Sequence, residues 1–117
     1  MSQFIPWFDI PSSDFDRAVD FYSYVFNMSF EKIDCGTEKM ACFPNGLGSI
    51  FYDGIHQPAN GGVIIHITVN SIEDTCKRIE EKGGKIIMPK TKIQAEGRGY
   101  FALFLDTEGN KLGIYQD

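Results

Sequence analysis

Two stretches of this chain carry the same succession of apolar and polar residues. Residues 5–22 read IPWFDIPSSDFDRAVDFY, and residues 62–79 read GVIIHITVNSIEDTCKRI. In each stretch a short apolar run is followed by apolar residues at i, i+3, i+4 and i+7, the spacing of an amphipathic helix. The pattern therefore predicts a strand and then a helix, repeated at an offset of 57 positions (from residue 5 to residue 62).

Each predicted helix has a candidate N-terminal cap. Ser13 and Asn70 precede the helical spacing, and Asp16 and Glu73 follow them by three positions. An acid at this spacing accepts the backbone N–H of the cap residue, while the cap side chain accepts an N–H of the first turn. We therefore expect Ser13 and Asn70 to cap the two helices.

The rest of the pattern completes two copies of one βαβββ module. Strands are expected over residues 4–10, 28–33, 40–43, 47–52, 63–69, 85–88, 99–105 and 111–116, and helices over 14–26 and 71–82. The Gly- and Pro-rich segment 53–62 links the copies. We predict one α+β domain over residues 1–117, with module 1 at about 1–54 and module 2 at about 63–117.

Alternation within the first strand of each module points to candidate functional residues. Side chains alternate between the two faces of a strand, and the uniformly apolar face is the one that a helix covers. Trp7 and Asp9 in module 1, and Ile64 and His66 in module 2, then point away from the helices. Asp9 and His66 occupy equivalent repeat positions, so we expect them to face each other. They are candidates for general-base catalysis, or else a polar pair that only satisfies itself.

The segment MPKTKIQAEGRGYF contains three basic residues, Lys90, Lys92 and Arg98. It is expected to form a loop between strands, which is either simply solvated or attracts an anion to the rim of a cavity. The register of the following strand, 99–105, depends on its turns. Phe101 and Phe104 are therefore both candidates for the inward position.

Charge and composition exclude several functions. The chain has a net charge of −5 and no stripe of Lys or Arg, which argues against a nucleic-acid partner. No apolar run reaches the roughly 18 residues of a membrane-spanning helix, and the first residues lack the pattern of a signal peptide. Three cysteines without a CxxC pair fit reduced thiols, so a cytoplasmic location is expected.

Three stretches carry a family resemblance that covers nearly the whole chain. They are IPSSDFDRAVDFYSYVFN, ITVNSIEDTCKRIEEKGGKI and FALFLDTEGNKLGIYQ. The chain resembles the glyoxalase / bleomycin-resistance / extradiol-dioxygenase superfamily, also called vicinal oxygen chelate proteins, and within it the small proteins described as lactoylglutathione lyase-related. The resemblance implies paired βαβββ modules whose mixed sheet curls around a central cavity. It also implies a homodimer, in which the modules pair within a chain or are exchanged between chains.

Metal-using members of this superfamily place four ligands, usually His and Glu, on the inward faces of the first and last strands. Carried over by motif spacing, these positions fall on Trp7, Ser49, Ile64 and Gly113. None of these residues offers a competent ligand for a divalent metal. The expectation is therefore the scaffold without a cofactor. A two-residue shift would bring only Asp9 and His66 into ligand positions, so a divalent metal is disfavoured.

Three functions are consistent with these residues, and whether the chain is an enzyme is left open. The first is binding of a small organic molecule in the sheet cavity. The second is a lyase or isomerase that uses Asp9 and His66 for proton transfer. The third, a metal-dependent glyoxalase or dioxygenase, is disfavoured by the missing ligands. The aromatic residues Trp7, Phe51 and Tyr115 are either core or a stacking platform for a ligand. The expected ligand-binding residues are Trp7, Asp9, Ser49, Phe51, Ile64, His66, Gly113 and Tyr115.

Overall fold

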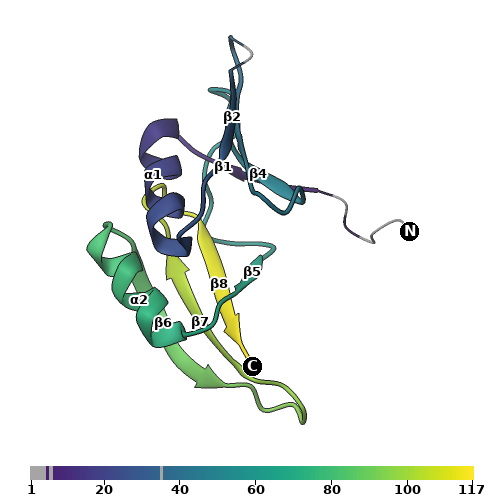
Figure 1. Cartoon of the computed structure of the whole chain (residues 1–117), viewed down its shortest axis with the longest axis vertical. Helices are drawn as coiled ribbons and strands as arrows, with labels where there is room; N and C mark the ends of the chain where they lie inside the picture. The colour runs from purple at the N-terminus through teal and green to yellow at the C-terminus, as the bar shows by residue number, and fades with distance from the viewer. Residues whose placement is uncertain (1–4, 6, 35) are drawn as a thin grey trace.

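The computed structural model describes residues 5, 7–34 and 36–117, and these form two helices and eight strands (Figure 1). Module 1 contains β1 (Phe8–Pro11), α1 (Phe15–Phe26), β2 (Glu31–Asp34), β3 (Lys39–Cys42) and β4 (Gly48–Tyr52). Module 2 contains β5 (His66–Thr68), α2 (Ile72–Glu81), β6 (Lys85–Lys92), β7 (Tyr100–Leu105) and β8 (Lys111–Gln116). The predicted α+β class and the tandem βαβββ order are confirmed. Among the described residues, neither helix has the length and apolar character needed to cross a membrane.

The described strands form two four-stranded sheets of mixed direction, which Figure 1 shows inclined to each other. Sheet A has the order β1-β4-β3-β2, and sheet B has the order β5-β8-β7-β6. In each sheet the first and last strands of the module are parallel neighbours, and the other pairs are antiparallel. A parallel pair needs a crossover connection, and here the crossover contains the helix that covers one face of the sheet. We call the opposite face of each sheet its open face.

The two helices begin one residue later than predicted. Asp14 caps α1, and its side chain accepts the backbone N–H of Arg17 at 3.1 Å. Ser71 caps α2 in the same way, accepting the N–H of Asp74 at 3.2 Å. The expected caps, Ser13 and Asn70, are therefore wrong by one position. The two observed caps still lie 57 positions apart (14 to 71), so the repeat itself is preserved.

Most strand boundaries also differ from the predicted ones by one to four residues, β6 among the most. β6 continues to Lys92, because its second half pairs with Tyr100 and Phe101 of β7. Lys90 and Lys92 therefore lie in a strand and not in the predicted loop. β1 is described from Phe8 onward, and residues 4 and 6 of the predicted first strand lie outside the described residues, as does Cys35.

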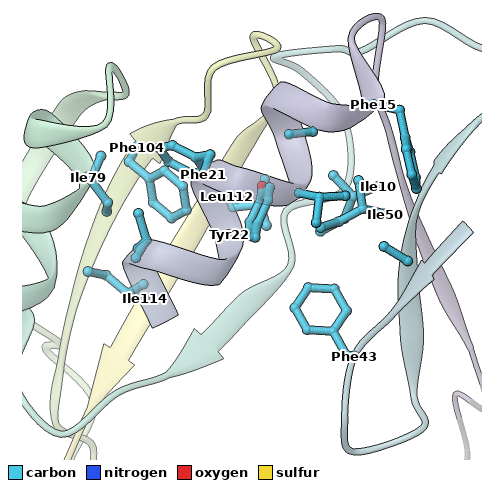
Figure 2. Packing of buried hydrophobic residues seen from close by; sticks show 14 of the residues in the cluster. Ile10, Phe15, Phe21, Tyr22, Phe43, Ile50, Ile79, Phe104, Leu112 and Ile114 are labelled. Atoms are coloured by element: carbon cyan, nitrogen blue, oxygen red, sulfur yellow. The ribbon is translucent and has the colours of Figure 1, made fainter. Parts of the chain in front are cut away.

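A single buried cluster joins the two modules around α1 (Figure 2). Ile10 and Ile50 enter it from sheet A, and Phe104 and Ile114 enter it from sheet B. The ring of Phe21, on α1, lies 6.2 Å from the ring of Phe104, on β7 of the other module. Apolar burial contributes about 25 cal/mol per Å², so a core shared in this way holds the modules together.

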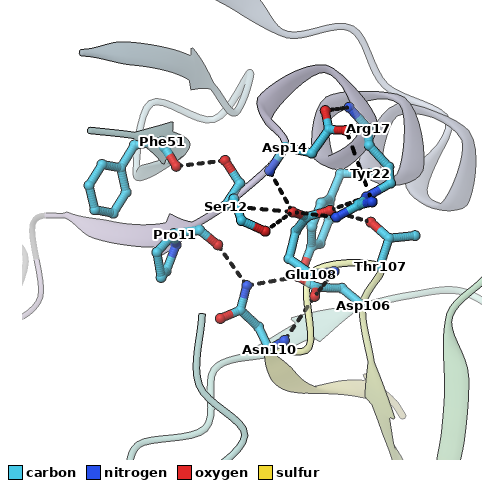
Figure 3. Close-up of polar contacts among 11 residues, drawn as sticks. Pro11, Ser12, Asp14, Arg17, Tyr22, Phe51, Asp106, Thr107, Glu108 and Asn110 are labelled. Atoms are coloured by element: carbon cyan, nitrogen blue, oxygen red, sulfur yellow. Dashed lines mark hydrogen bonds and ion pairs between the residues drawn. The ribbon is translucent and has the colours of Figure 1, made fainter. Parts of the chain in front are cut away.

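A network of polar contacts, which we call the polar seam, links the same two modules (Figure 3). The carboxylate of Glu108, in the turn between β7 and β8, accepts the backbone N–H groups of Ser13 at 3.0 Å and Asp14 at 2.8 Å. It also forms two hydrogen bonds with the guanidinium of Arg17, at 2.7 and 3.1 Å. The side chain of Glu108 is completely buried although it carries a charge. Module 2 thus supplies an anion to the amino end of the module 1 helix, where the helix dipole favours it.

The second half of the seam is built on Asp106. Its Oδ2 accepts the hydroxyl of Tyr22 at 2.7 Å and the side-chain amide of Asn110 at 3.0 Å. The same amide donates to the carbonyl oxygen of Pro11 at 2.8 Å, which again links the two modules. Burial raises the pKa of Asp106 even though these hydrogen bonds oppose the shift. The pKa of the Tyr22 hydroxyl is also raised, first by its burial and then by the nearby charge of Asp106. Every buried polar side-chain atom among the described residues has a partner.

The Glu108 carboxylate makes the fold sensitive to acid. Burial alone would raise its pKa, but hydrogen bonds from Arg17, Asp14, Thr107 and Ser13 outweigh that effect and lower the pKa from 4.5 to about 2. A group with a lowered folded-state pKa contributes stability that is present above its unfolded value. The contribution of Glu108 is therefore fully present above pH 4.5 and is lost as the pH falls toward 2. Asp106, whose pKa is raised, acts in the opposite direction over the acid range.

We predict that Glu108→Gln lowers the free energy of unfolding at neutral pH by about 2 kcal/mol, because charge-assisted hydrogen bonds are lost at a buried site. Urea unfolding followed from pH 7 to pH 3 should also show a flatter acid dependence for the variant than for the parent chain. Glu38→Gln removes the same charge from an exposed position and serves as the matched control. Equal behaviour of the two variants would contradict the role given to the seam.

Candidate functional site

The open faces of the two sheets carry the residues that the sequence singled out. In β1 Ile10 is buried in the core while Asp9 is exposed, so Asp9 points away from α1. Asp9 pairs in register with Ser49 of β4, and His66 pairs with Gly113 of β8. The predicted alternation along both first strands is therefore confirmed. The parallel strand pairs of the two sheets are therefore equivalent. The pair Asp9 and Ser49 in sheet A corresponds to the pair His66 and Gly113 in sheet B.

On sheet A the carboxylate of Asp9 is held by its neighbours. Its Oδ1 accepts the indole N–H of Trp7 at 2.8 Å and the hydroxyl of Ser49 at 2.9 Å. Ser49 is fully buried, so its hydroxyl has a fixed acceptor. Trp7, Asp9 and Ser49 thus form one polar cluster on this open face, and three of the predicted ligand-binding residues do come together.

On sheet B the imidazole of His66 lies across its neighbouring strand. A Cβ atom on Gly113 would collide with the Nδ1 and Cε1 atoms of His66, so the ring occupies space that any other residue would fill. The ring of Phe101 meets it edge-on, with centroids 6.2 Å apart. Among the described residues neither ring nitrogen of His66 has a hydrogen-bond partner, which leaves both available to a ligand.

Asp9 and His66 do not form the expected pair within one chain. Asp9 lines a small hollow of ≈ 150 Å³ between the modules, together with Asn110 and Lys111. His66 lines a different hollow, on the open face of sheet B. The expectation that the two side chains face each other is therefore corrected for the single chain, because the two sheets are inclined and do not close on one another (Figure 1).

The hollow at His66 has a mostly apolar lining and a volume of ≈ 460 Å³. Two further sides come from the segment between β6 and β7, which folds back on itself through a hydrogen bond from the N–H of Ile93 to the carbonyl of Gly99 at 3.0 Å. The open register question of β7 is resolved, because Phe101 faces the hollow while Phe104 is buried in the core. The residues that line the hollow are His66, Ile93, Ala95, Arg98, Phe101 and Tyr115.

Sequence reasoning identified some of this hollow and missed the rest. The sequence predicts His66 and Tyr115 at a binding site, and it offers Arg98 either to a solvated loop or to a cavity rim. It does not predict Ile93 and Ala95, because nothing local marks two isolated apolar residues in a polar segment as the wall of a hollow. Gly99 is a signal in the sequence that points to this segment. A Cβ there would collide with the backbone of Gln116, so glycine permits the close approach that shapes the segment.

The remaining predicted residues lie elsewhere. Ile64 is partly buried in the irregular segment before β5. Phe51 lies on the open face of sheet A, with its ring 5.8 Å from that of His56 in the linker. The Nδ1 of His56 lies 2.6 Å from Asp53, and the hydrogen bonds from the side chain and backbone of His56 and from the backbone of Ile55 lower the pKa of Asp53 to about 2.

The residues at the four positions that the resemblance assigned to metal ligands do not fit a metal. Trp7 donates its only polar hydrogen to Asp9, Ser49 donates its hydroxyl to Asp9, and Ile64 and Gly113 have no donor atoms in their side chains. Across residues 5, 7–34 and 36–117, no three His, Cys, Asp or Glu side chains are grouped so that they could hold a metal ion. At the hollow on sheet B, the polar side chains free to meet a ligand are the imidazole of His66 and the guanidinium of Arg98.

Comparison with known proteins gives consistent results. A family model described as the Glyoxalase/Bleomycin resistance protein/Dioxygenase superfamily matches residues 4–114. A glyoxylase-like domain-containing protein from Didymella fabae is 30% identical over 114 residues, which cover 91% of this chain and 88% of the relative.

Solved structures give the same fold at low sequence identity. A glyoxalase I mutant from Zea mays superposes with a TM-score of 0.75 at 19% identity, covering 97% of this chain and 44% of that one. The fosfomycin resistance protein FosX from Listeria monocytogenes superposes with a TM-score of 0.68 at 20% identity, covering 100% of this chain and 92% of that one.

Proposed function

The chain belongs to the Glyoxalase/Bleomycin resistance protein/Dioxygenase superfamily, and we propose that it acts there by binding a small organic molecule without a divalent metal. The observation that carries this proposal is the hollow of ≈ 460 Å³ on the open face of sheet B. Sites for small organic molecules are mostly apolar, have volumes of about 300 to 1,000 Å³, and contain a few polar groups that fix orientation. The hollow has each of these properties.

The lining residues support binding in physical terms. Phe101 and Tyr115 offer aromatic faces, and Ile93 and Ala95 offer aliphatic contacts, so an apolar body loses water contact on several sides. The imidazole of His66 contributes one free donor and one free acceptor when it is neutral. A ligand with an apolar body and one polar group is therefore well matched to this hollow.

Binding of a small molecule is better supported than a reaction in which Asp9 and His66 transfer a proton. A general base is usually oriented by a second polar group, and the proposed partner of His66 was Asp9. Asp9 lies in a different hollow, and its Oδ1 already accepts hydrogen bonds from Trp7 and Ser49. The positions of Trp7 and Ser49 likewise support the absence of a metal from the function, since neither side chain is a usual ligand.

We predict that aromatic fragments, screened by amide chemical-shift perturbation, shift resonances of residues 93–101 and 113–116 before any others. His66→Ala should weaken the best fragment several-fold, and Gly113→Ala should do the same because its methyl group displaces the imidazole. The matched controls are His56→Ala, in the linker, and Gly61→Ala, where a Cβ meets open space. Perturbations confined to residues 40–51, or binding that is indifferent to His66→Ala and Gly113→Ala, would refute this location.

We also propose that a second copy of the chain covers the open faces. Trp7 and Met88 remain 38% exposed there, and Ile33 remains 42% exposed. Exposed apolar residues on the face of a sheet are a surface that a partner would cover, and a C2 dimer is the commonest assembly. A second copy lying over sheet B would also enclose a ligand in the hollow.

Sedimentation equilibrium at micromolar concentration should therefore give the mass of a dimer. Ile33→Asp combined with Met88→Lys should shift the chain toward the monomer, because the charges would be buried in the interface. Ile55→Asp alters a 77% exposed linker residue and should leave the mass unchanged. A parent chain that stays monomeric would overturn the proposed assembly.

A further inference from the structure

The hollow at His66 presents hydrogen-bond donors in excess of acceptors. Its polar lining residues are His66, Arg98 and Tyr115. The hydroxyl of Tyr115 is already engaged, since it donates to Asp117 at 2.9 Å and accepts the backbone N–H of Gly99 at 3.2 Å. His66 and Arg98 therefore supply the free polar groups of the lining. Arginine has five donors and no acceptor, and imidazole always carries at least one donor.

The three basic residues of this region have different partners. Lys90 lies 3.1 Å from the carboxylate of Glu73 and 4.6 Å from the centroid of the Tyr100 ring. Lys92 donates to the backbone carbonyl of Arg98 at 2.7 Å and also lies over the ring of Tyr100, at 5.3 Å. Both ammonium groups are thus occupied. In the described part of the chain, the guanidinium of Arg98 forms neither a hydrogen bond nor an ion pair.

The surroundings hold Arg98 at the hollow. Its backbone N–H donates to the carbonyl of Ala95 at 3.3 Å, and Lys92 fixes its carbonyl oxygen. Gly99, the next residue, is fully enclosed against the backbone of β8 and the chain end. The backbone that carries the Arg98 side chain is therefore already ordered. Less conformational entropy is lost when this side chain forms an ion pair with a ligand.

We propose that the ligand of this hollow is an apolar carboxylate, whose aromatic or aliphatic body lies against Phe101 and Tyr115 and whose carboxylate pairs with Arg98. This assignment rests on the proposed function and adds the chemical class of the ligand. The planar fork of arginine matches a carboxylate through two parallel hydrogen bonds, which a neutral amide or an amine cannot reproduce. His66 also lines the hollow and supplies a further donor.

Two carboxylates of the chain could compete for Arg98, and neither is paired with it: Glu96 is close in sequence, and the backbone of Asp117 packs against Gly99. Asp117 accepts the hydroxyl of Tyr115, and Glu96 is exposed in the segment between β6 and β7. An exposed carboxylate gives a weak pair in water, whereas an apolar ligand that excludes water strengthens the same pair. The arrangement therefore favours an anion that brings its own apolar surface.

The test compares three probes of equal shape by isothermal titration calorimetry: 2-naphthoate, 2-naphthamide and 2-naphthylmethylamine. The parent chain should bind the carboxylate about tenfold or more tightly than the amide, the gain expected from a charge-assisted pair. The amine should bind more weakly than the amide. Arg98→Gln should abolish the preference for the carboxylate, and Arg98→Lys should restore part of it. Lys77→Gln, on the exposed face of α2, makes the same change in net charge and should leave the preference intact.

The outcomes separate this inference from the function on which it rests. Equal binding of 2-naphthoate and 2-naphthamide, or a preference that survives Arg98→Gln, would overturn the ligand class while the hollow remains a binding site. Failure of all three probes to perturb the amide resonances of residues 93–101 would overturn both. A preference that is lost in Lys77→Gln as well would show a general charge effect and would also overturn the role of Arg98.

Discussion

The arrangement of the two modules depends on the buried carboxylate of Glu108 at the amino end of α1. This one group accepts backbone N–H groups from Ser13 and Asp14 and binds the guanidinium of Arg17 (Figure 3). Because α1 also packs into the core of both modules, the contact sets the angle between the two sheets. That angle in turn decides where the open faces point. The separation of the two hollows follows from it, so the seam influences where the proposed ligand site lies without lining it.

The two modules share a scaffold but differ in chemistry at equivalent positions. In sheet A the paired residues are an acid and a hydroxyl, and Ser49 donates to Asp9 at 2.9 Å. In sheet B the paired residues are an imidazole and a glycine, and the missing side chain of Gly113 makes room for the ring of His66. The first arrangement satisfies itself, while the second leaves its polar group free. This difference explains why the proposed ligand site lies on one sheet rather than symmetrically between them.

Local patterns in the sequence predicted the elements, and long-range contacts decided the details. The repeat and the alternation of β1 and β5 were sufficient for the module order and for the faces of Asp9 and His66. Ser13, the expected cap of α1, instead donates its backbone N–H and its hydroxyl to Glu108, a residue 95 positions away. The expected pairing of Asp9 with His66 failed for a similar reason. Alternation tells which face a side chain occupies, but the angle between two sheets is set by contacts that no local pattern records.

We propose that this superfamily scaffold has an apolar hollow with an imidazole and a guanidinium in place of a metal centre. Elemental analysis of the untagged protein, after dialysis with nickel, zinc and iron and then without them, distinguishes the two. Since the residues at the four ligand positions are Trp7, Ser49, Ile64 and Gly113, we expect that no metal is retained near one per chain. Retention of one metal ion per chain would contradict it and would make Asp9 and His66 the first residues to examine as ligands.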